Sequence, residues 1–73
     1  MPGLNLTNFT ASKDPNEIFA FVSNAIFAHE MIATGQYKKA LKIFPYEYEF
    51  AMDNKGIDHG KFVEELNNQL HIN

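Results

Sequence analysis

Three histidines and a short acidic segment are the residues best suited to chemistry in this sequence. His29 precedes a glutamate, but the helical zinc-protease pattern needs a second histidine four residues later, where the chain has Ala33. His59 follows Asp53 and Asp58 in a turn-rich segment. Imidazole nitrogens and carboxylate oxygens from separate elements can bind one metal ion. The sequence therefore allows a weak metal- or ligand-binding alternative at Asp53, Asp58 and His59, with His29 as a further donor.

Groups for covalent catalysis or cofactor binding are scarce. The chain has no cysteine, which removes thiol nucleophiles, thiolate metal sites and disulfides together. Neither of its two serines, Ser12 and Ser23, lies in a glycine-flanked turn of the kind that exposes a nucleophile. Its four glycines are scattered instead of forming a phosphate-binding loop. We expect a non-enzymatic protein with no cofactor and no dedicated metal site.

Charge and hydropathy restrict the partners. The formal net charge is −3, and all six basic residues are lysines, three of them at Lys38, Lys39 and Lys42. Without arginine, bidentate recognition of phosphates and bases has no carrier, so we expect no nucleic-acid partner. The most apolar run, 18–33, is too short and too polar for a membrane span, and the first residues lack the features of a signal peptide. We expect a cytoplasmic protein with no membrane partner.

One turn and the helix after it read DNKGID at 53–58 and then continue to Phe62 and Leu66. This pattern resembles the loop and exit helix of an EF-hand, and the resemblance implies calcium binding by oxygen ligands. The loop is about two residues shorter than the family's, and Lys55 and Lys61 stand where the family has ligands. A plain turn followed by a helix N-cap is the simpler interpretation.

The elements that must position these residues begin with a helix over 14–34. Its first residues, DPNE at 14–17, supply an N-cap carboxylate, a proline suited to the first turn and a glutamate at the third position. Gly35 supplies the C-terminal stop. A second, short helix is predicted over 36–44 and ends before Pro45.

The segment 44–52 is ambiguous, because apolar and aromatic residues alternate there with polar or small ones at a two-residue period. That period favours a strand, but the weakly patterned segment 4–10 is its one available partner. We favour a short helix over 46–53. A last helix over 58–70 has an apolar stripe led by Phe62.

The sequence thus predicts a mainly α fold. A single helical domain covers 14–73 and follows an irregular lead-in at 1–13. The domain is a small bundle of three to four helices, over about 14–34, 36–44, 46–53 and 58–70. The alternative is an α+β fold with a short hairpin-like sheet from 4–10 and 44–52.

Residues 33–44, ATGQYKKALKIF, contain a Gly-x-Tyr-x-x-Ala run. They resemble the middle of a tetratricopeptide repeat, where such a run links two antiparallel helices. The resemblance covers about a third of one repeat. It implies a helical hairpin in this part of the chain and a role in protein binding.

The first helix carries the functional prediction, because 12 of the 16 residues from Ile18 to Ala33 are apolar. A surface helix ordinarily has an apolar stripe somewhat over 100° wide, and this helix exceeds it. The additional apolar side chains either pack in the core of the monomer or stay exposed and bind a partner. We predict a protein–protein interaction module, either self-associating as a homo-oligomer or docking on a larger protein as an adaptor or inhibitor. The predicted interface residues are Phe19, Phe27, Met31, Tyr46 and Tyr48.

Overall fold

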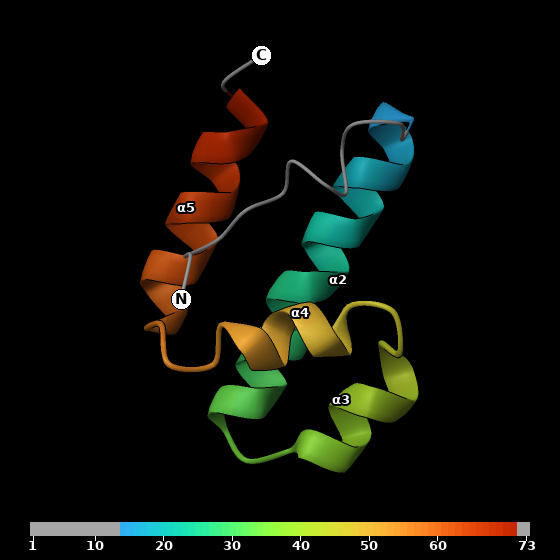
Figure 1. Cartoon of the computed structure of the whole chain (residues 1–73), viewed down its shortest axis with the longest axis vertical. Helices are drawn as coiled ribbons and strands as arrows, with labels where there is room; N and C mark the ends of the chain where they lie inside the picture. The colour runs from blue at the N-terminus through green and yellow to red at the C-terminus, as the bar shows by residue number, and fades with distance from the viewer. Residues whose placement is uncertain (1–13, 72–73) are drawn as a thin grey trace.

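The computed structural model describes residues 14–71, which form four α-helices and no strand. These helices are α2 over Pro15–Ala33, α3 over Tyr37–Ile43, α4 over Tyr48–Asp53 and α5 over His59–His71. Each of the three shorter helices packs against α2. In Figure 1, α5 lies alongside α2, α4 crosses α2, and α3 lies beyond α4. The predicted small helical bundle is confirmed, whereas 1–13, including 4–10, lie outside the described residues.

Both ends of α2 are fixed by local hydrogen bonds that the sequence predicts. The Asp14 carboxylate accepts a hydrogen bond of 2.8 Å from the Asn16 backbone N–H, as an N-cap residue does. After the last turn, Gly35 has a φ of +84°, which glycine adopts without steric cost. The chain then reverses, and the Gln36 N–H donates to the Met31 carbonyl over 2.8 Å. This turn directs α3 back onto α2.

The side chains of α2 divide the helix into a buried side and a solvent-exposed strip. Val22, Ala25 and Ile32 are buried against the other helices. The opposite strip contains exposed polar residues at Asn16, Ser23 and Glu30. The apolar helix is therefore the central element of the bundle, with α3, α4 and α5 packed on its buried side.

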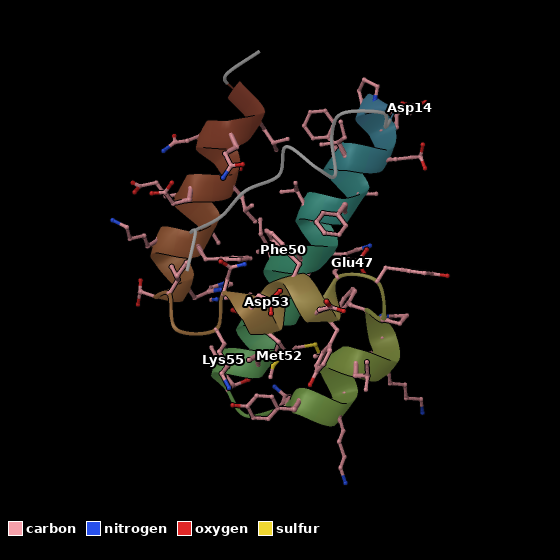
Figure 2. All side chains as sticks on the ribbon, viewed as in Figure 1. Asp14, Glu47, Phe50, Met52, Asp53 and Lys55 are labelled. Atoms are coloured by element: carbon pink, nitrogen blue, oxygen red, sulfur yellow. The ribbon has the colours of Figure 1, made fainter. Side chains whose placement is uncertain are left out.

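Two apolar clusters form the core, one on each side of α4. The first joins α2, α4 and α5 and consists of Val22, Ala25, Phe50, Phe62 and Leu66. The second joins α2, α3 and α4 and consists of Ala28, Ile32, Ala40 and Ala51. Figure 2 shows Phe50 and Met52 leaving α4 on opposite sides, one toward each cluster. Alanines dominate the second cluster, so the three helix backbones can approach closely there.

The strand alternative for 44–52 is wrong. Residues 45–47 form a turn, and α4 begins at Tyr48, two residues later than predicted. The physical reason is that this six-residue helix is buried on two sides. Apolar residues then occupy most of its positions, and so short a helix cannot display a clear 3.6-residue period.

Local bonds also define the start of α5. The Asp58 backbone carbonyl accepts from the Phe62 N–H over 2.8 Å, which closes the first helical turn. Ile57, just before this turn, packs against the first core cluster, which contains Phe62. A hydrophobic residue before the N-cap and another in the first turn of the helix are the arrangement of a hydrophobic staple.

Candidate functional site

The clearest surface feature is a group of aromatic and apolar residues over the second core cluster. The Phe27 ring of α2 stacks on the Phe44 ring at the end of α3, with 6.3 Å between centroids and 9° between ring planes. Phe44, Met31 and Tyr48 are half-buried and pack on the second cluster. We call Phe27, Met31, Phe44, Tyr46 and Tyr48 the aromatic patch.

Exposure within the aromatic patch is uneven. Tyr46, two residues after Phe44, is 84% exposed, and Phe27 is 57% exposed even with its stacking partner in place. Met31 and Tyr48 are partly buried and pack against the second core cluster. Aromatic side chains that present such area in water are typical of interface centres.

Of the five predicted interface residues, Met31 and Tyr48 pack on the second cluster, Phe27 joins them through Phe44, Tyr46 lies in the turn between Phe44 and Tyr48, and Phe19 is apart. Phe19 is also 57% exposed, but it lies eight residues before Phe27 on α2, about 12 Å along the helix axis. Phe44, which connects α2 and the end of α3, was not among the predicted interface residues. Its position four residues after Ala40 on the packed side of α3 is the signal that could have identified it.

Opposite charges lie on the two helices that adjoin the aromatic patch. Lys38, Lys39 and Lys42 are exposed on α3, which carries no acidic residue. Glu49 and Asp53 are exposed on α4, which carries no basic residue. The surface therefore changes sign from one of these helices to the next.

The carboxylate of Glu47 differs from those of Glu49 and Asp53, because it is buried at the start of α4. Its Oε2 accepts a hydrogen bond of 3.4 Å from the side-chain amide of Asn24 on α2. Figure 2 shows Glu47 on the end of α4 that faces α2. This contact joins the start of α4 to α2.

A second polar feature lies inside the bundle, around His29. The side chain is 1% exposed. Its Nε2 lies 2.9 Å from the Asn54 backbone oxygen, and its Nδ1 lies 2.9 Å from Nδ1 of His59. One face of the His29 ring stacks on Phe62 with 3.9 Å between centroids. One imidazole thus connects α2, the turn after α4 and α5.

The hydrogen bonds of His29 determine where its proton lies. A carbonyl oxygen can only accept, so Nε2 of His29 carries the hydrogen, and Nδ1 of the neutral ring must accept from His59. Burial lowers the pKa of His29, and the charge of His59 lowers it further. The Asn54 carbonyl and the Asp58 carboxylate oppose this decrease. Burial therefore favours the neutral form that the hydrogen bonds require.

The residues of the metal-binding alternative do not form a common site with His29. Asp53 is exposed on α4, and the Asp58 carboxylate lies 3.4 Å from the Lys61 backbone N–H at the start of α5. Within residues 14–71, no three His, Asp or Glu side chains are grouped as metal ligands. The two histidine nitrogens that meet are joined by a hydrogen bond. Two ligands of one zinc ion, at about 2.0–2.1 Å each in a tetrahedral arrangement, would stand farther apart.

Comparison of the chain with protein-family models, curated proteins and solved structures finds no match in any of the three. None of the described helices is long and apolar enough to cross a membrane.

Proposed function

We propose that this chain is a protein-interaction module whose partner is a second copy of itself, bound through the aromatic patch. The observation that carries the proposal is the exposure of Phe27 and Tyr46 beside half-buried Phe44. Single exposed apolar residues are ordinary on a protein surface. A connected group that rests on the core is typical of a binding surface.

The free energy available from burying the exposed aromatic rings is sufficient for a modest interface. Complete burial of one large apolar side chain contributes about 1.5–3 kcal/mol, and Phe27 and Tyr46 still have most of that contribution to gain. Association costs several kcal/mol in lost translational and rotational freedom. A two-fold dimer buries these two anchors from each copy, four in all, and their combined contribution supports a dimer of moderate affinity.

Charge complementarity favours a second copy over an unrelated protein. A two-fold symmetric interface uses the same surface on both subunits, so that surface must complement itself. Here α3 with its lysines and α4 with its carboxylates adjoin one patch. A two-fold rotation can place the basic helix of one copy opposite the acidic helix of the other, which selects the partner and its orientation.

Sedimentation equilibrium as a function of protein and salt concentration tests this proposal. We expect the average mass to rise from 8.3 kDa toward twice that value as concentration increases. Added salt should weaken the dimer several-fold, because it screens the charges of α3 and α4. Dimerisation that does not depend on salt would contradict the charge argument. A strict monomer at about 1 mM would contradict self-association altogether.

A further inference from the structure

The His29–His59 contact has geometry that makes it sensitive to protons. The two rings are inclined by 17°, and their centroids are 5.2 Å apart although their Nδ1 atoms are separated by 2.9 Å. These values describe rings that meet edge to edge in nearly one plane. The lone pair of one nitrogen then points at the N–H of the other, as a linear hydrogen bond requires.

The two histidines respond differently to an added proton. Protonation of His59 at Nε2 leaves its Nδ1–H in place, so the bond to His29 persists. Protonation of His29 adds a hydrogen to Nδ1, so two N–H groups face each other unless His59 moves its own hydrogen from Nδ1 to Nε2. His29 must at the same time remain buried with a positive charge, because its Nε2 is held by the Asn54 carbonyl.

Few ionisable groups near His29 can stabilise its positive charge. His59 and Asp58, both at the start of α5, are the two ionisable groups whose charges act on His29. Asp58 favours the charged form of His29, and His59 opposes it. From the end of α4, Asn54 contributes a neutral carbonyl. Its own side-chain oxygen is buried without a hydrogen-bond partner among the described residues, so this junction already contains an unsatisfied polar atom.

We propose that His29 and His59 form a pH-sensitive latch that holds the start of α5 against α2 and releases it when His29 takes up a proton. Release of α5 uncovers the first core cluster, because Phe62 and Leu66 leave Val22 and Phe50. The device is independent of the aromatic patch. Phe27 and His29 are two residues apart on α2 and therefore project to nearly opposite sides of the helix.

The direction of the pH effect follows from linkage. The pKa of His29 is lowered on folding, so the unfolded or released chain binds its proton first as pH falls. The contribution of the latch to stability is complete above about pH 6.5 and is lost progressively as pH decreases toward the folded-state pKa. Over that window, uptake of one proton raises the unfolding constant by up to about tenfold per pH unit.

Urea unfolding between pH 5 and 7.5 tests the latch in the wild type, in His29→Gln and in Ser23→Gln, which places the same side chain at an exposed position of α2. We expect the wild type and the Ser23→Gln control to lose stability below about pH 6.5 with the slope of one proton. His29→Gln should be less stable at pH 7 and nearly independent of pH in this window. Equal slopes in wild type and His29→Gln, or no slope in the wild type, would overturn the proposal.

Two measurements on the wild type keep the test valid if His29→Gln does not fold. Long-range ¹H–¹⁵N spectra at pH 7.5 should show His29 as the neutral tautomer protonated at Nε2. Amide exchange, corrected for its intrinsic pH dependence, should show α5 losing protection before α2 as pH falls. The Nδ1–H tautomer, or simultaneous loss of protection in both helices, would contradict the latch.

Discussion

Phe62→Ala is expected to destabilise the folded state by about 3–5 kcal/mol, the largest effect of any single truncation in this chain. Phe62 is fully buried, and its ring packs on His29 at 3.9 Å and lies 6.0 Å from the Phe50 ring, both measured between centroids. Truncation leaves a cavity where α2, α4 and α5 meet. A chain of 73 residues has a total stability of about 4–11 kcal/mol, so much of it would be lost.

Urea unfolding followed by far-UV circular dichroism at pH 7 measures this change. Phe19→Ala is the matched control, because it removes the same atoms from a side chain that is 57% exposed. We expect the control to change the free energy of unfolding by less than about 1 kcal/mol. Similar losses in the two variants would show that Phe62 is not the centre of the core.

Phe27→Asp is expected to weaken self-association by about 100-fold or more. The substitution removes an aromatic anchor and places a carboxylate in the aromatic patch, where the partner would exclude water from it. Together these effects amount to at least about 2.8 kcal/mol, and each 1.4 kcal/mol corresponds to tenfold in affinity. The dissociation constant from sedimentation equilibrium measures the change.

Phe19→Asp provides the control for charge and hydropathy. Phe19 has the same exposed fraction as Phe27 and lies on the same helix, but outside the aromatic patch. We expect this variant to associate like the wild type. Equal loss of association in both variants would indicate a general effect of the added charge, and no loss in Phe27→Asp would exclude the patch.

Elements whose signals are local could be predicted from the sequence. The start of α2 depends on Asp14 and its own neighbours, and its end depends on the backbone freedom of Gly35. The apolar face of α2 was also predictable, because 19 residues display several turns of the 3.6-residue period. The same period is hidden in α4, where six residues are packed from both sides.

Features that need two distant segments could not be derived in detail. His29 and His59 are separated by 30 positions, and only the packing of α5 on α2 brings their nitrogens within 2.9 Å. Both histidines could be singled out from the sequence for their chemistry, but the sequence pattern suggested metal ligands and not a hydrogen-bonded pair. The stacking of Phe27 on Phe44 is equally non-local, because it depends on the turn that folds α3 back. Exposure follows from this packing, so four residues of the aromatic patch could be named from the sequence, but Phe44 could not, and Phe19 was named although it lies outside the patch.

Intermolecular nuclear Overhauser effects in a mixture of ¹³C-labelled and unlabelled protein test the central proposal most directly. At concentrations that favour the dimer, we predict contacts from the rings of Phe27, Phe44 and Tyr46 in one copy to α3 and α4 of the other. Salt and Phe27→Asp should remove these contacts. Intermolecular contacts that map to α5, or their absence from a sample of dimeric mass, would contradict self-association through the aromatic patch.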